Sequence, residues 1–472
     1  GVRGERSTGV RSVTYSNFID RKLTSVAPAG IEVPDAWRGA GLFDFQSDLT
    51  RWAIRRGRAA IFADTGLGKS RMQLRWAYTI HASTGVDVLI LAPLAVAAQT
   101  QREGATIGVP VTLCREQSDV RPGLNITNYD RLHKFDTSRF GAVVLDESSI
   151  IKHHTAKTLA LLLDAFRGTP FRLCATATPA PNDWTELGTH AEFLGICTRS
   201  EMLSEFFVHD GGDTQTWRLK GHARSAFWRW VSSWGALIRK PSDLGYDDAA
   251  YALPPLRVTQ HAVDTNAQTA GMLFAMEAQT LMERRDARRA SLEERVRECA
   301  AIVNADRQPW IVWCDLNAEG DALRDAIPDA VEIRGSDDAE VKERRLIEFA
   351  DGKIRALITK PSIAGFGLNW QHCARMAFVG VTDSFEAYYQ ALRRCWRFGQ
   401  TRDVHVHIFA SELEGSVIAN LARKERDALA MSDAMSAETH DAVMSAVRGS
   451  TRQSNPYHPT QRIALPDFLR VA

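Results

Sequence analysis

The residues best suited to chemistry form a glycine-rich run, residues 63–70 (ADTGLGKS), between an apolar segment and an amphipathic one. A strand, a glycine loop and a helix in this order surround a bound phosphate with backbone N–H groups and the positive end of the helix. In such a loop Lys69 neutralises the β- and γ-phosphates of a nucleotide, and the Ser70 hydroxyl holds Mg²⁺. The usual pattern opens with glycine, whereas this run opens with Ala63. The plain alternative is a glycine-rich turn. The loop residues expected to bind a nucleotide are Thr65, Gly66, Gly68, Lys69 and Ser70.

Two acidic residues, Asp146 and Glu147, end another apolar segment, Ala142–Leu145. Placing carboxylates at the end of a buried strand costs free energy unless they have a task. Asp146 can share Mg²⁺ with Ser70, and Glu147 can orient or deprotonate an attacking water. Considered without the phosphate loop, such a pair is also common as solvated acids at the end of a strand. Following a phosphate loop, it predicts nucleotide hydrolysis.

The elements that position these residues are short apolar runs separated by helical stretches. This rhythm predicts an α/β fold with parallel strands covered on both faces. The first block of expected strands is Ala59–Phe62, Val86–Leu91, Val109–Leu113, Leu124–Thr127, Ala142–Leu145 and Arg172–Thr176. A second, similar block is Trp310–Cys314, Val331–Ile333, Ile354–Thr359, Met376–Val379 and Val404–Phe409.

The segment between the two blocks has a different character. Its aromatic residues cluster over 206–234, where they either stack exposed bases or, as the favoured interpretation, pack a helical insertion. Residues 237–241 look like a linker, and 265–304 like a charged helical protrusion. The expected organisation is an arm (1–40), a first lobe (41–195), a linker with helical protrusions (196–304), a second lobe (305–425) and a C-terminal tail (426–472).

The composition limits the classes of function. Lys and Arg number 58 against 57 Asp and Glu, which excludes a polybasic mode of nucleic-acid binding and requires a local basic stripe instead. The seven cysteines include no C-x-x-C pair and favour free thiols over disulfides or zinc. No apolar run of about 18 residues and no secretory signal occur, so no membrane association is expected.

The order of these motifs resembles that of superfamily 2 helicases and translocases, and among them the Swi/Snf-like DNA translocases. Gln46 matches the upstream glutamine that reads adenine in that family, and residues 66–70 match its motif I. Residues 146–149 read DESS where the family pattern is DEAH. Further resemblances in the first block lie at 91–94 (motif Ia), 126–130 (ITNYD), 151–153 and 176–179 (motif III).

The second block carries the most specific string, residues 390–400 (QALRRCWRFGQ), which closely resembles the translocase motif VI. By this alignment Arg394 and Arg397 are arginine fingers, and a guanidinium placed across a cleft stabilises charge on a transferred phosphoryl group. Without that context the run would read as a basic helix face. Residues 365–369 (GFGLN) resemble motif V, which adds Gly367 as a nucleotide contact.

The resemblance implies two tandem RecA-like parallel-sheet lobes with a helical, aromatic-rich insertion, and an ATP-dependent translocase on double-stranded DNA. ATP and Mg²⁺ are the implied cofactors, with Ser70 and Asp146 as metal ligands. The implied catalytic residues are Lys69, Asp146, Glu147, Arg394 and Arg397. Contacts to the DNA backbone are expected from Arg102, Thr127, Asn128, Lys360 and Ser362.

Two other functions stay open on the sequence. One is a strand-separating DNA or RNA helicase of the same superfamily, and the other is a scaffold module with a vestigial nucleotide site. The intact Lys69, acid pair and fingers argue against decay, since hydrolysis is what requires them. The short inter-lobe segment predicts a compact motor of bacterial or phage type, cytoplasmic in the cell or infected host. A nuclease or another DNA-processing protein is a further expected partner.

Overall fold

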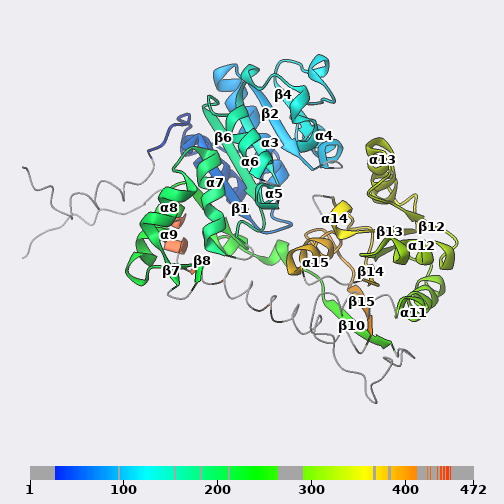
Figure 1. Ribbon diagram of the computed structural model, residues 1–472. Helices are drawn as coiled ribbons and strands as arrows, with labels where there is room; N and C mark the ends of the chain where they lie inside the picture. The colour runs from blue at the N-terminus through cyan, green and yellow to red at the C-terminus, as the bar shows by residue number, and fades with distance from the viewer. Residues whose placement is uncertain are drawn as a thin grey trace, which may run out of the picture.

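The computed structural model describes residues 27–93, 96–153, 156–180, 183–210, 213–263, 291–364, 368–380 and 384–411, with separate residues between 423 and 447. Two parallel β-sheets with flanking helices dominate it (Figure 1). The α/β class with large parallel sheets predicted from the sequence is therefore confirmed. We call each sheet with its helices a unit, the first and the second in chain order.

The first sheet has seven strands, and every pairing in it is parallel. Neighbouring residues of β1 belong to different cores, because Ala59 and Ile61 face one hydrophobic cluster and Ala60 and Phe62 face the other. Both faces of the sheet are thus buried. In spatial order the strands are β3 (Val111–Leu113), β4 (Leu124–Asn128), β2 (Asp87–Ala92), β5 (Phe140–Asp146), β6 (Phe171–Thr176), β1 (Arg58–Ala63) and β9 (Gly235–Ile238).

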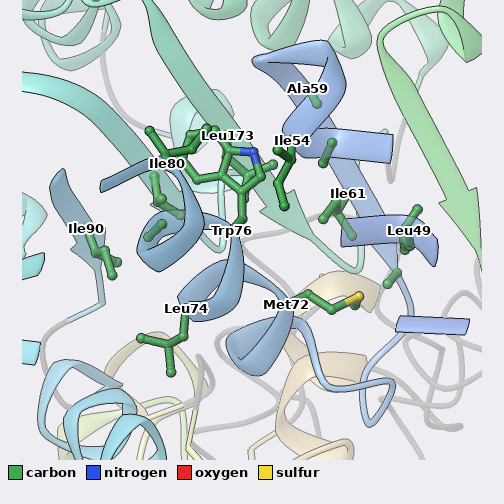
Figure 2. Packing of buried hydrophobic residues seen from close by; sticks show 14 of the residues in the cluster. Leu49, Ile54, Ala59, Ile61, Met72, Leu74, Trp76, Ile80, Ile90 and Leu173 are labelled. Carbon is green, nitrogen blue, oxygen red and sulfur yellow. The ribbon is translucent and has the colours of Figure 1, made fainter. Parts of the chain in front are cut away.

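The helix after β1 packs its apolar stripe on this sheet. Met72, Trp76 and Ile80 are fully buried, at the four-residue spacing of one helical face (Figure 2). This stripe anchors the residues that begin the same helix. The helices around the first sheet are α2 (Asp44–Arg56), α3 (Lys69–Thr84), α4 (Val96–Thr106), α5 (Ile150–His153), α6 (Ala156–Ala165) and α7 (Leu187–Leu194).

The second sheet has six strands and is also parallel throughout. In spatial order they are β10 (Leu256–Val263), β15 (Val404–Ser411), β14 (Arg375–Phe378), β11 (Trp310–Trp313), β13 (Ala356–Thr359) and β12 (Ala330–Glu332). Its helices are α11 (Leu292–Ala305), α12 (Asn317–Ala326), α13 (Ala339–Ala350), α14 (Pro361–Ala364) and α15 (Phe385–Leu392).

The aromatic segment folds onto the first sheet. It forms α8 (Arg199–Phe206), β7 (Phe207–Asp210), β8 (Asp213–Leu219) and α9 (Arg224–Ser232). Its large rings are core residues of that unit, which agrees with the packing interpretation. The buried rings are Phe206, Phe207, Phe227, Trp228, Trp230 and Trp234.

The boundaries of the two units differ from the predicted ones. Leu237 and Ile238, expected in a linker, belong to β9 beside β1, because their side chains extend the buried sheet. The second sheet begins with β10, well before residue 305. Helix α11 packs Val296, Cys299 and Val303 into the second core, so this part of the predicted protrusion is a sheet-covering helix. Residues 264–290 lie outside the described residues.

The C-terminal segment returns to the first unit. Val443 and Val447 are buried in the same core as α2 and α3, and Arg51 Nη2 donates to the carbonyl oxygen of Val447 at 3.5 Å. Asp433 forms an ion pair with Arg239, which follows β9. The predicted tail therefore includes a part that is packed. Residues 448–472 lie outside the described residues.

All seven cysteines are free, and burial raises the pKa of Cys197 to about 12 and that of Cys114 to about 11. Every helix in the described part of the chain is too short or too polar to span a bilayer.

Candidate functional site

The glycine loop links β1, which ends at Ala63, to α3, which begins at Lys69. Gly66 and Gly68 both adopt left-handed conformations, with φ of 91° and 81°. A Cβ on Gly68 would lie 2.3 Å from Gln46 Nε2, and one on Gly66 would lie 3.0 Å from the backbone nitrogen of Phe398. Both positions therefore require glycine, and the loop has the strand–loop–helix geometry that cradles phosphate.

Gln46 supports this loop from α2. Its Nε2 donates to the carbonyl oxygen of Leu67 at 2.8 Å, while its Oε1 accepts from the backbone N–H of Phe43 at 3.0 Å. The side chain is almost fully buried and lines the cavity described below. The predicted adenine-reading glutamine thus lies beside the loop and fixes its course.

The acid pair lies at the carboxyl end of β5. Asp146 Oδ1 accepts from Gln73 Nε2 at 2.7 Å and from the backbone N–H of Glu147 at 3.1 Å. The Tyr129 hydroxyl donates to the Asp146 carbonyl oxygen at 2.7 Å. Glu147 has φ of 49°, a sparsely populated conformation for a residue with a side chain, and the Thr176 hydroxyl lies 3.5 Å from its Oε2. The surroundings hold both carboxylates in place against this strain.

Opposite charges meet where the loop faces the acid pair. Lys69 Nζ donates to the carbonyl oxygens of Ala63 at 2.9 Å and Asp64 at 3.4 Å. Burial lowers the Lys69 pKa, and Glu147, Asp64 and Asp146 oppose that shift. Burial and the charge of Glu147 raise the Asp146 pKa to about 6. The site therefore holds ionisable groups close together in a poorly solvated place, as hydrolytic sites do.

The second unit contributes two arginines, from the segment that follows α15. Arg394 is 1% exposed, and its Nε and Nη2 donate to the carbonyl oxygen and Oε1 of Gln390 at 2.8 Å and 2.9 Å. Gln390 Nε2 lies 3.4 Å from the Thr178 hydroxyl of the first unit. Burial lowers the Arg394 pKa to about 10 and, with the charge of Arg394, lowers the Arg397 pKa to about 9.

Arg397 is the less engaged of these two arginines. Its Nη1 donates to the Leu368 carbonyl oxygen at 3.3 Å, whereas its buried Nε has no hydrogen-bond partner in the described part of the chain. The Arg397 charge also lowers the Lys69 pKa, so the two cations share one electrostatic environment. A buried donor without a partner beside a second cation is suited to an anion.

A cavity of about 330 Å³ joins all these groups between the two units. One set of lining residues carries charge or a hydroxyl: Lys69, Ser70, Asp146, Glu147, Arg394 and Arg397. Another set is aromatic, with Tyr251 stacked on Phe398 at 4.7 Å between ring centroids and Phe43 packed edge-on against both. The volume and the division into polar and aromatic linings suit a nucleotide.

The metal ligands predicted from the sequence fit this cavity. Ser70 and Asp146 both line it, and hydroxyl and carboxylate oxygens are the ligands Mg²⁺ prefers. The hydrogen bonds of Asp146 within the described residues engage Oδ1, which leaves Oδ2 for a cation. Among the described residues, no three or more His, Cys, Asp or Glu side chains form a group that could hold a metal. A Mg²⁺ site here would be completed by water and phosphate oxygens.

The predicted nucleic-acid contacts lie outside the cavity. Arg102 Nη1, on α4, is 3.2 Å from Asp351 Oδ1 of the second unit. Thr127 and Asn128 are buried at the end of β4, and Asn128 Oδ1 accepts from the backbone N–H of Arg131 at 3.0 Å. Lys360 is half-buried and Ser362 is exposed at the start of α14. Gly367 lies outside the described residues.

Several site residues were not predicted from the sequence. Gln73 lies one helical turn after Lys69, and that spacing was a signal for a side chain on the same face. Phe43, Tyr251 and Phe398 come from distant segments, so their juxtaposition has no local signal. Arg393, next to Arg394, contacts the glycine loop.

The chain matches no family model and no curated protein sequence. Its function is therefore inferred from the residues and their geometry.

Asp146 leads to a prediction about pH. The folded pKa of Asp146, about 6, exceeds the ordinary value of 3.8. Protonation of Asp146 therefore stabilises the nucleotide-free fold. This contribution is fully present below about pH 4 and is lost as pH rises through about 6. Mg²⁺ requires the carboxylate, so Mg²⁺-dependent nucleotide binding is expected to weaken as pH falls below about 6. Nucleotide titrations with and without Mg²⁺ at several pH values check this. Asp146→Asn should abolish the Mg²⁺ dependence, and an unchanged wild-type affinity across this range would contradict the assignment.

Proposed function

We propose that the chain is an ATP-hydrolysing motor that tracks along double-stranded DNA, with each unit acting as a RecA-like lobe. The observation that carries the proposal is the single cavity lined by the glycine loop and acid pair of one unit and by the arginines of the other. A lysine, acids, and arginines from the opposite unit around one space are the groups that phosphoryl transfer requires. The motif order that resembles Swi/Snf-like translocases supports the same conclusion.

Each residue of the cavity then has a role. Lys69 leaves the carbonyl oxygens of Ala63 and Asp64 and turns its ammonium to the β- and γ-phosphates. Glu147 orients the attacking water and accepts its proton, a task favoured by its fixed backbone. Arg397, whose Nε has no partner within the described residues, donates to the γ-phosphate oxygens. Ser70 and Asp146 would hold Mg²⁺, which would neutralise phosphate charge when bound.

The aromatic lining supports adenosine as the other half of the ligand. Phe43 is 46% exposed, and its own backbone N–H donates to Gln46 Oε1. Its ring is therefore held in place and available to a base. Tyr251, which packs against the core of the first unit, stacks on Phe398 of the second unit and adds a second aromatic surface. This arrangement favours a nucleoside triphosphate over a simple phosphate or an acidic peptide.

Coupling to DNA follows from the distribution of the site over two units. Hydrolysis needs the arginines and the loop together, so a change in the phosphates changes the contact between units. At the surface, Arg102 and Asp351 form an exposed ion pair across the units, and such pairs contribute little free energy. A DNA phosphate can therefore replace the carboxylate at small cost, which supports backbone tracking rather than base reading.

ATP turnover measured against duplex DNA, single-stranded DNA and RNA tests this function. We expect duplex DNA to stimulate most, with stimulation that declines as salt rises, because backbone contacts release counterions. Displacement of a triplex-forming strand would demonstrate tracking, and Asp146→Asn serves as the inactive control. Stronger stimulation by single strands or RNA would indicate a strand-separating helicase. Background turnover with every nucleic acid would leave the scaffold function.

A further inference from the structure

A second set of contacts joins the units at the same glycine loop. Arg393 Nη2 donates to the Thr65 carbonyl oxygen at 2.7 Å, and Arg393 Nε donates to the Thr65 hydroxyl. Arg393 Nη2 also lies 3.3 Å from Asp64 Oδ2, and the Tyr389 hydroxyl lies 3.1 Å from Asp64 Oδ1. We call Asp64, Thr65, Tyr389 and Arg393 the clasp. It joins two consecutive residues of the loop, Asp64 and Thr65, to two residues one helical turn apart at the end of α15.

The centre of the clasp is buried: Arg393 and Thr65 are buried, while Asp64 and Tyr389 are partly exposed. Arg393 is 5% exposed, and its guanidinium carbon lies 5.7 Å from the ring centroid of Tyr389 and 5.2 Å from that of Trp396. A planar guanidinium that is stacked on rings and hydrogen-bonded through two nitrogens is confined to one orientation. Buried charge-assisted hydrogen bonds are also stronger than exposed ion pairs. The clasp is therefore a more specific inter-unit contact than the surface pair of Arg102 and Asp351.

The clasp holds the loop from the side opposite to the phosphates. Arg393 does not line the 330 Å³ cavity; it lines a separate one of about 370 Å³, together with Asp64, Arg239 and Lys240. Thr65 and Gly66 line both cavities, so the loop is the wall between them. A nucleotide can thus bind without displacing Arg393.

The clasp also fixes the segment that carries the two fingers. Arg393 directly follows α15, and Arg394 is the next residue, so the peptide between them is common to both side chains. Further along, Phe398 packs its backbone against Gly66, which gives this segment a second contact with the loop. With both ends of the run 393–398 held against residues 65 and 66, Arg394 and Arg397 between them face the first cavity.

We propose that the clasp docks the second unit on the glycine loop before ATP binds, and that Arg393 is a positioning residue for Arg394 and Arg397. The catalytic part of this inference rests on the proposed ATPase function, whereas the docking part does not. Arg393 does not line the first cavity; it acts through the backbone that it shares with the fingers.

Amide hydrogen exchange of residues 63–70, measured without nucleotide, tests the docking. In Arg393→Ala we expect exchange in this segment to accelerate by about tenfold or more, because the loop loses its partners. The matched control is Arg115→Ala, which removes an exposed arginine whose Nη1 lies 2.9 Å from Glu340 Oε1 across the same two units. The control should leave exchange in 63–70 at the wild-type rate. Equal exchange in wild-type protein and Arg393→Ala would overturn the docking.

Steady-state ATP turnover tests the positioning. We expect Arg393→Ala to lower kcat roughly a hundredfold while KM changes little, since misplaced fingers slow chemistry more than binding. Arg393→Lys keeps the charge for Asp64 but lacks the planar fork, so it should recover loop protection more fully than kcat. In a double-mutant cycle, Asp64→Asn with Arg393→Ala should be no slower than Arg393→Ala by itself.

The outcomes separate the two proposals. A raised KM with unchanged kcat in Arg393→Ala, or independent effects of the two substitutions, would refute positioning while leaving the ATPase intact. A wild-type protein without ATP turnover would refute the proposed function, and accelerated loop exchange in Arg393→Ala would still support the docking contact.

Discussion

Replacing Arg397 by alanine is expected to lower ATP turnover by about a thousandfold or more, with a much smaller loss of ATP affinity. Its Nε is buried without a partner among the described residues, and the charges of Arg394 and Arg393 add to burial in lowering its pKa to about 9. Burial and the neighbouring arginine charges disfavour the Arg397 cation, and the charge that develops on a transferred phosphoryl group would offset this. The arginine therefore contributes most in the transition state.

Measuring kcat and KM with saturating duplex DNA checks this expectation, and Arg402→Ala is the matched control. Arg402 lies near Arg397 in the sequence but faces solvent, and its Nη1 lies 3.3 Å from Gln308 Oε1, away from the cavity. Because Arg397→Ala also removes repulsion, thermal unfolding should show no large loss of stability. Equal kcat values for the two variants would exclude Arg397 from catalysis.

Replacing Lys69 by alanine is expected to abolish measurable turnover and to weaken ATP binding about a hundredfold, the equivalent of roughly 3 kcal/mol for lost hydrogen bonds to charged phosphates. The structure adds an effect on pH. Lys69 lowers the Asp146 pKa, so its removal should raise that pKa further. In the folded variant the Asp146 carboxyl then binds its proton more tightly. The variant therefore loses stability relative to wild type as pH rises.

Nucleotide titrations and melting temperatures at several pH values test both effects. Lys353→Ala is the control, since Lys353 is 68% exposed and lies outside the cavity. If Lys69→Ala bound ATP as tightly as this control, the glycine loop would not be a phosphate site, and the proposed function would fail with it.

The sequence predicted the strands that carry the site because each is a short buried run, and buried parallel strands have a strong local signal. It missed β9 and β10 for different reasons. Two of the four residues of β9, Leu237 and Ile238, read as the start of a linker that ends at Pro241, although Ala236 and Ile238 are buried against β1. β10 is an edge strand whose residues Arg257–Gln260 are exposed, so it has no apolar pattern to detect.

The predicted nucleotide residues converge because motif spacing records which strand ends share an edge of a sheet. Residues that act through tertiary contact leave no such record. Tyr251 is one example, since it reaches the cavity from a short turn after Asp248 and meets Phe398 of the other unit. Arg393 is another, because the doublet with Arg394 gives no indication that the two side chains line different cavities, with the glycine loop between them.

The return of the C-terminal segment to the first core has a mechanical consequence. The chain leaves the first unit after Tyr251 and is back at Val443 and Val447, so the second unit is tethered at two places instead of one. A body on a single tether can twist and swing in every direction, whereas two anchors favour rotation about the line that joins them. Successive cycles would then repeat the same arc, and a shortened chain that ends before Val443 would lose that guidance while keeping every residue of the cavity.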